Sequence, residues 1–178
     1  IKIYPNSSNL DYVYYFLAIS FYEQIIDEKK DTFSILRAKE YFNYVILNYP
    51  NTEYAIDAAF KINLINDILA AKELYVGRYY IDKKKWIAAI NRFKNVINKY
   101  DTTIYVEEAL FRLVEVHYLI GLEDEAKKYA KLLGYNYQSS KWYENSYIIF
   151  DKNYAINKIQ KENNGILKRF KSLFKWDE

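Results

Sequence analysis

The residues that could carry out chemistry are few in this sequence. His117 is the only histidine and there is no cysteine, so a histidine-based metal site or a catalytic triad would depend on one side chain. This histidine follows Leu110, Leu113 and Val114 on an apolar helical stripe, which is the usual setting of a packed structural histidine. We therefore predict no metal site and assign His117 a structural role.

The acidic and glycine residues do not form a catalytic pattern either. The adjacent acids Glu107 and Glu108 point to different faces of a helix, where they favour its N-terminal end through the helix dipole. The four glycines are isolated and none precedes a Lys-Ser or Lys-Thr pair, so the sequence contains no phosphate-binding loop. We predict no catalytic residues, no cofactor and no enzyme activity.

Arg92 is the remaining candidate for a functional side chain. It lies in the stretch WIAAINRFKNVINKY, residues 86–100, whose apolar residues fall on one helical stripe. Arg92 is about 100° from Phe93 around the helix, so it can project outward while Phe93 packs inward. A planar guanidinium suits bidentate pairing with a carboxylate. The residues alone leave two readings open, a solvated charge or a point of contact with a partner.

The composition indicates a globular protein built of helices. With 4 Gly and 2 Pro in 178 residues, the sequence has too few turn-forming residues for a β fold with many strands. Its 19% of aromatic residues is too high for a disordered chain. A net charge of +3, without a basic and aromatic stripe, argues against nucleic-acid binding. No apolar run approaches the ~18 residues of a membrane span. Because the chain begins at Ile1 and not at Met, we expect it to be a trimmed or partial chain, so that any signal peptide or lipidated cysteine would lie upstream.

The helix signals come in pairs along the chain. Ser8 to Asp11 has the shape of a capping box, and Pro50 ends the second helix. Gly121 and Gly134 are predicted to end two later helices. The predicted helices span about 9–26, 32–49, 51–81, 86–100, 103–121, 123–133 and 140–161.

A repeated spacing of small and aromatic residues links these helix pairs. In the middle pair, Gly77, Tyr80, Ala89 and Phe93 are separated by 3, 9 and 4 residues, which is the tetratricopeptide pattern. The small residues let two antiparallel helices approach closely, and the aromatic residues fill the grooves beside them.

The third pair repeats this spacing, and the first pair keeps the same register with about eight extra residues in its turn. The residues are Ala18, Phe21, Ala38 and Phe42 in the first pair, and Val114, His117, Ala126 and Ala130 in the third. The pattern predicts an all-α fold, an α-solenoid of tetratricopeptide-like helix pairs with extra C-terminal helices. We expect residues 1–150 to hold three repeats, at about 4–50, 51–101 and 102–138, and one further helix. Residues 151–178 are predicted as a C-terminal helical extension.

Four phrases of the sequence are similar to a known family. They are NLDYVYY (9–15), ELYVGRYYIDKKKWIAAINRF (73–93), VEEALFRLVEVHYLIGLEDEAKKYAKLLGYNY (106–137) and SSKWYENSY (139–147). These phrases resemble the BamD (ComL) family, the tetratricopeptide lipoproteins of the outer-membrane β-barrel assembly (BAM) machinery. The similarity covers about residues 4 to 150, although His117 stands where the family usually has Tyr and Asp101 replaces a common Pro.

The resemblance implies a partner set and a location. Family members carry five repeats behind a signal peptide and an acylated Cys, and this chain resembles the last three. In the family, these last three repeats dock the last POTRA domain of BamA and the accessory BAM lipoproteins. Recognition of unfolded outer-membrane proteins is chiefly ascribed to the N-terminal repeats, which this chain lacks. The implied function is a non-catalytic scaffold at the periplasmic face of the outer membrane, with membrane contact through an upstream lipid anchor.

The resemblance also implies site residues. The position of Arg92 is the one that, in the family, faces the POTRA domain and pairs with acidic surface there. Asn91, Arg78 and Lys94 are weaker candidates for the same partner-binding role. The segment NLDY near the start of the chain leaves two interpretations of Asp11 and Tyr12 open. In one, Asp11 stabilises the N-terminus of a helix and Tyr12 packs in the core. In the other, both residues line a concave groove that binds extended peptide.

Two alternatives remain at this stage. The chain could be a generic tetratricopeptide adaptor that binds peptide segments of a cytoplasmic or cell-envelope partner, or an envelope repeat protein with peptidoglycan partners. The tail GILKRFKSLFKW, residues 165–176, is predicted to be a basic amphipathic helix that buries Phe170 and Phe174 against protein, as a cap on the last repeat or in the groove of a partner. The alternative is a helix that lies on an anionic membrane surface.

Overall fold

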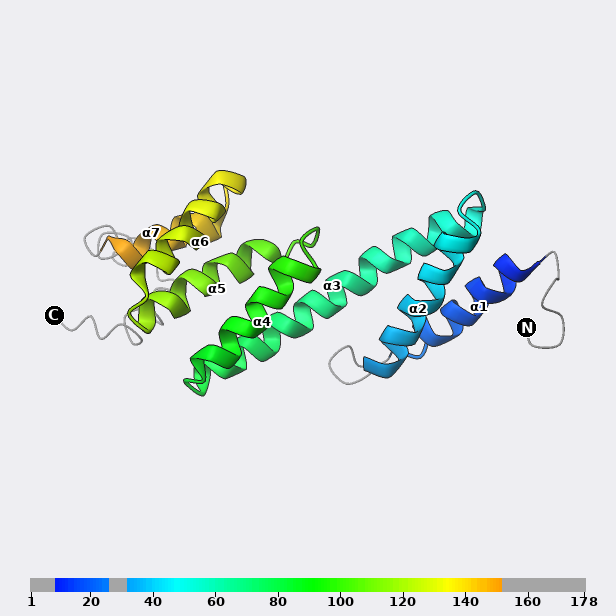
Figure 1. The fold of residues 1–178 in the computed structure, drawn as a ribbon, viewed down its shortest axis with the longest axis horizontal. Helices are drawn as coiled ribbons and strands as arrows, with labels where there is room; N and C mark the ends of the chain where they lie inside the picture. The colour runs from blue at the N-terminus through cyan, green and yellow to red at the C-terminus, as the bar shows by residue number, and fades with distance from the viewer. Residues whose placement is uncertain (1–8, 26–31, 152–178) are drawn as a thin grey trace. The chain divides into compact units, whose positions relative to one another are not determined.

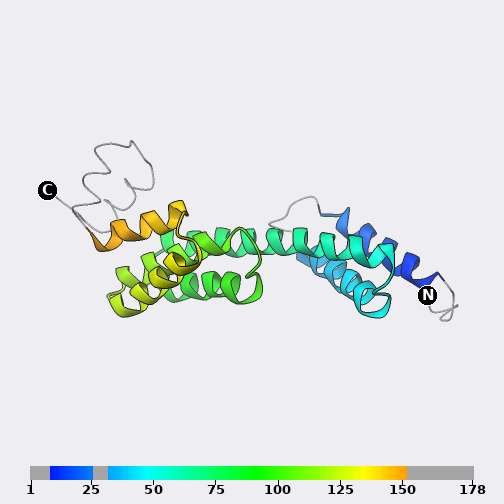
Figure 2. The ribbon, with the colours of Figure 1, turned by 90° about the horizontal axis from the view of Figure 1, so that it is seen from above.

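The computed structural model describes residues 9–25 and 32–151 of the chain. Within these ranges the structure contains seven helices and no strand (Figures 1 and 2). The helices are α1 (Leu10–Tyr22), α2 (Thr32–Asn48), α3 (Glu53–Asp82), α4 (Trp86–Lys99), α5 (Val106–Leu119), α6 (Glu123–Asn136) and α7 (Lys141–Phe150). The prediction of an all-α, tetratricopeptide-like fold is confirmed. The exact division into three repeats stays a prediction.

The chain forms two compact units, and the boundary between them falls inside α3. The first unit comprises residues 1–72 and contains α1, α2 and the first part of α3. The second comprises residues 73–178 and contains the rest of α3 with α4 to α7. No helix in the described ranges is both long enough and apolar enough to cross a membrane.

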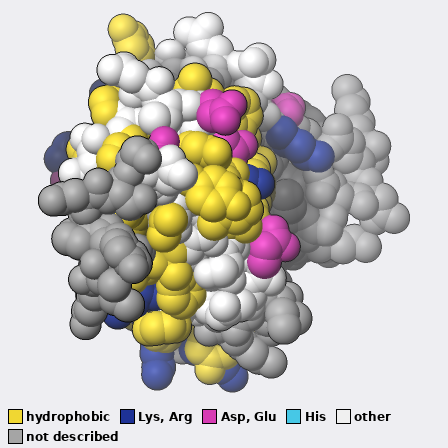
Figure 3. All heavy atoms as spheres, turned by 90° about the vertical axis from the view of Figure 1, so that its right-hand side faces the viewer, with side chains coloured by type: hydrophobic (Ala, Val, Ile, Leu, Met, Phe, Trp, Pro, Cys, Tyr) yellow, Lys and Arg dark blue, Asp and Glu magenta, His cyan; other side chains and the backbone are white. Residues whose placement is uncertain are grey.

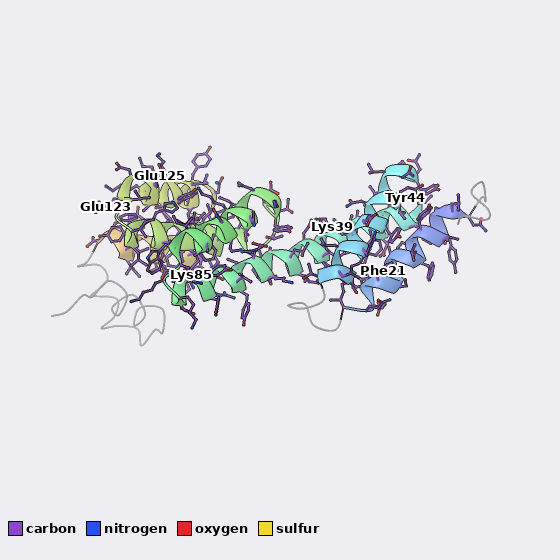
Figure 4. All side chains as sticks on the ribbon, turned by 60° about the horizontal axis from the view of Figure 1, so that its bottom comes forward. Phe21, Lys39, Tyr44, Lys85, Glu123 and Glu125 are labelled. Atoms are coloured by element: carbon purple, nitrogen blue, oxygen red, sulfur yellow. The ribbon has the colours of Figure 1, made fainter. Side chains whose placement is uncertain are left out.

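The core of the first unit forms where α1 and α2 face each other. Ala18 of α1 and Ala38 of α2 are fully buried, and such small side chains allow two helices to approach closely. Phe42 is also fully buried. Phe21 projects from α1 (Figure 4) and stacks on Tyr41 of α2, with ring centroids 5.7 Å apart and an interplanar angle of 12°. Aromatic packing therefore accompanies the small residues of this pair.

Polar contacts join the first part of α3 to both of these helices. The Tyr15 hydroxyl of α1 donates a hydrogen bond of 2.5 Å to Oδ2 of Asp57. From α2, Nζ of Lys39 (Figure 4) donates a hydrogen bond of 2.7 Å to Oδ1 of Asn66 on α3. One face of α3 is thus held by α1 and α2.

In the second unit, α3 and α4 approach closely at Gly77. A Cβ atom at Gly77 would lie only 2.4 Å from Cε1 of Phe93, so only glycine fits here without displacing the ring. Phe93 and Ala89 of α4 are fully buried. Helices α4, α6 and α7 all pack against α5, whose residues from Val106 to His117 are nearly all buried. Helix α5 is therefore the core of this unit.

The predicted helix ends were right at some positions and wrong at others. Gly121 has φ +82° and ends α5 in the left-handed conformation, as predicted. Gly134 does not end a helix: it lies inside α6, where a Cβ would meet the Tyr143 ring at 2.4 Å. Helix α5 begins at Val106, later than the predicted Asp101–Thr103 cap, and α7 ends at Phe150 because Asp151 is extended.

Other predictions fall on residues that the structure does not describe. Ser8 of the predicted capping box and the tail with Phe170 and Phe174 lie outside the described residues. At the start of α1, Asn9 is the N-cap residue but its side chain makes no capping hydrogen bond. At α7, by contrast, the Ser140 side chain accepts a hydrogen bond from the backbone N–H of Trp142, which completes an N-cap.

Candidate partner-binding surface

Helix α4 presents Arg92 at the surface beside the buried Phe93. The Arg92 side chain is 40% exposed, while Phe93 is fully buried. Because Phe93 is seated against Gly77, it fixes the rotation of α4 about its axis. The packing of α4 therefore determines the direction in which Arg92 leaves the helix.

A carboxylate of the same chain already lies at Arg92. Nη1 of Arg92 donates to Oε1 and Oε2 of Glu73 on α3, at 3.3 and 3.4 Å. Nδ2 of Asn95, one turn further along α4, donates to the same carboxylate at 3.2 Å. Both recorded Arg92 bonds use Nη1 and are longer than the 2.7–2.9 Å of a strong charge-assisted bond. The pair is loose and partly open to solvent.

Glu73 was not predicted to contact Arg92, although the sequence contains a signal for the contact. Glu73 precedes Gly77 by one helical turn, and Arg92 is adjacent to Phe93, which packs on Gly77. The same carboxylate acts on Tyr100 as well. Burial, and then the negative charge of Glu73, raise the pKa of Tyr100 above its ordinary value.

The weaker candidates differ in their surroundings. Asn91 is exposed and Lys94 is half-buried, both on α4. Arg78 of α3 is held by a carboxylate other than Glu73: its Nη1 donates to both carboxylate oxygens of Glu108 on α5, at 2.9 and 3.2 Å. The structure thus places Arg78 and Arg92 in two separate ion pairs.

The Arg78 ion pair is the outer end of a buried chain of charges. Glu108 also accepts from Nε of Arg112 at 3.2 Å, and Nη1 of Arg112 donates to Glu115 at 2.8 Å. The side chains of Arg112 and Glu115 are 7% and 1% exposed. Burial lowers the pKa of Arg112, but Glu115 and Glu108 more than offset this, and its pKa is raised. The Arg112 guanidinium therefore stays charged inside the second unit.

An aromatic side chain of α7 also contacts this chain of charges. The Arg112 guanidinium carbon lies 5.6 Å from the Trp142 ring and 5.4 Å from the Phe111 ring, within cation–π range. Sequence reasoning missed the chain because Glu108 was assigned to the helix dipole. Periodicity detects apolar faces, and it gives no signal for charges buried in pairs.

Asp11 and Tyr12 lie on α1 in the first unit. Asp11 is in the first turn of the helix, where a carboxylate complements the dipole. Tyr12 is 46% exposed and contacts the rings of Phe16 and Tyr54, at centroid distances of 4.4 and 5.9 Å. These three rings form a partly exposed aromatic cluster, which could line a peptide groove, and that role stays a prediction.

Tyr15, on the same helix, is held in its neutral form. Burial and the hydrogen bond to Asp57 raise the pKa of Tyr15 to about 12. Since the ordinary pKa of tyrosine is 10.0, the folded chain keeps this proton to a higher pH than the unfolded chain does.

His117 is packed in the second unit. The residue is 5% exposed, its Nδ1 lies 2.7 Å from the carbonyl oxygen of Leu113, and its ring lies 5.1 Å from that of Tyr129. Among the residues that the structure describes, no cluster of three or more His, Asp or Glu side chains could hold a metal ion.

Helix pairs joined by close small-residue contacts, with charged side chains presented on their outer surface, define a tetratricopeptide-like helical protein. The chain belongs to the YfiO family, described as outer membrane lipoprotein, whose family model matches residues 1–132.

The relatives of known name support this assignment. The chain is 49% identical over 154 residues to the outer membrane protein assembly factor BamD of Rickettsia prowazekii, an alignment that covers 86% of this chain and 61% of the relative. It is 43% identical over 153 residues to the BamD of Caulobacter vibrioides, covering 86% of this chain and 50% of the relative. The chain therefore spans only about half to three fifths of these relatives, and its resemblance to the BamD family is confirmed.

Proposed function

We propose that this chain is part of a non-catalytic assembly factor for outer-membrane proteins and acts as a scaffold of the BAM machinery. The two relatives described above, which carry the name outer membrane protein assembly factor, align with 86% of this chain. Because these alignments cover 86% of the chain, they include the part of the second unit that presents Arg92.

Within that function, Arg92 binds an acidic surface of the POTRA region of BamA. The observation that supports this step is the loose ion pair with Glu73: the Arg92 side chain is 40% exposed, and its guanidinium donates to Glu73 through Nη1 alone. The fork of Nε and Nη2 can then receive a partner's carboxylate in bidentate geometry. The exposed Asn91, next to Arg92 in the sequence, is a further candidate for contact with the same partner, as are Lys94 and Arg78.

Glu73 has a definite effect in this arrangement. It orients the guanidinium before the partner arrives, but it also competes with the partner's carboxylate for the same positive charge. Removing the Glu73 charge should therefore strengthen binding or leave it unchanged, whereas removing the Arg92 charge should weaken it. The two effects have opposite sign, and a general loss of structure would weaken binding in both variants.

The test is calorimetric titration of the chain with the purified POTRA region of BamA from the same organism. Arg92→Gln should weaken binding by about 2–5 kcal/mol if the pair is desolvated at the interface. Arg37→Gln is the matched control, because Arg37 is 43% exposed and pairs with Glu40 of its own chain at 2.8 Å in the first unit. Equal affinity of Arg92→Gln and the parent chain, or an equal loss in Arg37→Gln, would refute the assignment.

The proposal places the intact protein at the periplasmic face of the outer membrane, held by a lipid anchor upstream of these residues. Accessory BAM lipoproteins and unfolded outer-membrane proteins are its further partners, the latter through segments that this chain does not contain. Sequencing the gene upstream of Ile1 tests the location. A signal peptide that ends in a lipobox cysteine supports it, and a cytoplasmic start would favour the alternative of a generic peptide-binding adaptor.

A further inference from the structure

The outer face of the first part of α3 carries an exposed apolar stripe. Ile56, Phe60 and Leu64 follow one another four residues apart and are 69%, 70% and 46% exposed. Glu53 and Asp67 lie on the same face, one at each end. We call these five residues the α3 stripe. In Figure 3, which faces the first unit, hydrophobic side chains form a band at the surface.

The α3 stripe is not part of the core of the first unit. Ala55, Ala58 and Ile65 lie on the opposite face of α3 and are buried, and that face is the one that packs on α1 and α2. Three large apolar side chains aligned on one exposed face are more than the scattered single residues of an ordinary surface. The stripe is suited to contact another molecule.

The two charged residues of the α3 stripe itself, Glu53 and Asp67, are both negative. Lys61 and Lys72 are the only basic residues between positions 53 and 72, and both turn toward the core side. Nζ of Lys61 lies 5.1 Å from the Tyr22 ring of α1, and Nζ of Lys72 donates a hydrogen bond to Thr32 of α2. The stripe is therefore apolar in its middle and acidic at its two ends.

We propose that the α3 stripe docks an amphipathic helix of a partner protein whose apolar residues are flanked by Lys or Arg. Side chains four residues apart form a ridge that packs into the groove of a second helix. The stripe from Ile56 to Leu64 extends about 12 Å along α3, which matches two turns of such a helix. Basic flanks on the partner pair with Glu53 and Asp67. This site lies in the first unit and does not depend on the role proposed for Arg92.

The charges argue against two other occupants. A second copy of this chain, docked through the same stripe, would set Glu53 or Asp67 of one copy against a carboxylate of the other in either helix direction. An anionic membrane surface attracts basic residues and would repel both ends of the stripe. A basic amphipathic helix satisfies the apolar middle and the acidic ends together.

The experiment measures binding of two fluorescent peptides to the full chain by anisotropy. One is a synthetic helix with Leu at spacings of three and four residues and Lys at the flanking positions. The other has the same Leu positions with Glu in place of Lys. The proposal expects the lysine peptide to bind, more weakly at high salt, and the glutamate peptide not to bind. Failure of the lysine peptide to bind, or equal binding of both, overturns the proposal.

Variants of the chain locate the binding. Phe60→Ser should weaken binding of the lysine peptide about tenfold or more, and Glu53→Gln combined with Asp67→Asn should remove most of its salt dependence. Leu47→Ser is the matched control, since Leu47 is 79% exposed on α2. An equal loss in Leu47→Ser overturns the site. Two other results would also overturn the proposal. One is that the parent chain sediments as a dimer and the Phe60→Ser variant as a monomer. The other is that the parent chain binds anionic vesicles and the Phe60→Ser variant does not.

Discussion

Replacing Gly77 by alanine tests the close contact between α3 and α4. The new Cβ would lie 2.4 Å from Cε1 and 2.7 Å from Cζ of Phe93. Carbon atoms pack at about 3.5–4.0 Å, so the ring would have to move by roughly 1 Å. Phe93 is fully buried, so its ring cannot turn out into solvent without leaving the core. Overpacking of this kind costs about 1–3 kcal/mol.

Alanine also gains stability in a helix, which offsets part of this cost. The gain over glycine is about 1 kcal/mol in a helix interior. We therefore expect Gly77→Ala to lower the free energy of unfolding by about 0–2 kcal/mol. Because that net effect is small, the single variant alone does not isolate the contact, and a double-mutant cycle with Phe93→Leu is needed.

Leucine at position 93 lacks the two ring atoms that come nearest to the new Cβ. In the Phe93→Leu background, Gly77→Ala should therefore stabilise the chain by up to about 1 kcal/mol. The interaction energy of the cycle is then about 1–3 kcal/mol. The measurement is denaturant unfolding followed by tryptophan fluorescence, since Trp86 of α4 and Trp142 of α7 both lie in the second unit.

Gly134 provides a matched control with similar distances but a different neighbour. A Cβ there would meet Cε2 and Cζ of Tyr143 at 2.4 and 2.7 Å. The Tyr143 hydroxyl donates to Tyr147 at the surface, so its ring can swing aside. Gly134→Ala should change stability by less than about 1 kcal/mol. No interaction energy between positions 77 and 93, or an equal cost at 134, would refute the reasoning.

Three further predictions concern buried or partly buried polar groups, and each is measured by denaturant unfolding. Arg112→Met leaves the buried Glu115 carboxylate without its ion pair and should cost about 3–5 kcal/mol, most of which the added change Glu115→Leu should restore. The stability that Tyr15 contributes is complete below pH 10 and should be lost as the pH rises toward 12, a loss that is absent in Tyr15→Phe. Asn145→Leu should stabilise the second unit by about 1 kcal/mol, because the Asn145 amide is buried without a hydrogen-bond partner.

Each of these predictions has an outcome that contradicts it. If Arg112→Met is as stable as the parent, the chain of charges is not desolvated. If the parent chain and the Tyr15→Phe variant lose stability equally as the pH rises, folding does not raise the pKa of Tyr15. A loss of stability in Asn145→Leu would show that the amide has a partner, such as a buried water.

The fold could be predicted from the sequence because its signals are local. A stripe of apolar residues is a property of one helix. The fixed spacing of small and aromatic residues involves only two helices that follow each other in the sequence. Helix α4 begins at Trp86 in both the prediction and the structure. The same local reasoning failed at Gly134. Glycine signals both a helix end and a close approach, and only the Tyr143 ring, nine residues away, decides between them.

The candidate site could be predicted only in part, because it depends on contacts between helices. The outward direction of Arg92 follows from one helix, but its carboxylate, Glu73, comes from another. The buried charges of Arg112 and Glu115 gave no signal at all, since a charged residue reads as solvent-exposed until its partners are known. The role of Arg92 at a partner surface therefore stays a prediction.

The continuity of α3 has a consequence for how the chain unfolds. The boundary between the two units lies between Lys72 and Glu73, inside one helix of 30 residues. Within α3, each N–H just after Lys72 pairs with the carbonyl four residues before it, so four hydrogen bonds of the helix span this position. Melting either half leaves four carbonyls or four N–H groups of the other half without partners. A protease cut between Lys72 and Glu73 should therefore weaken the helix on both sides of the cut.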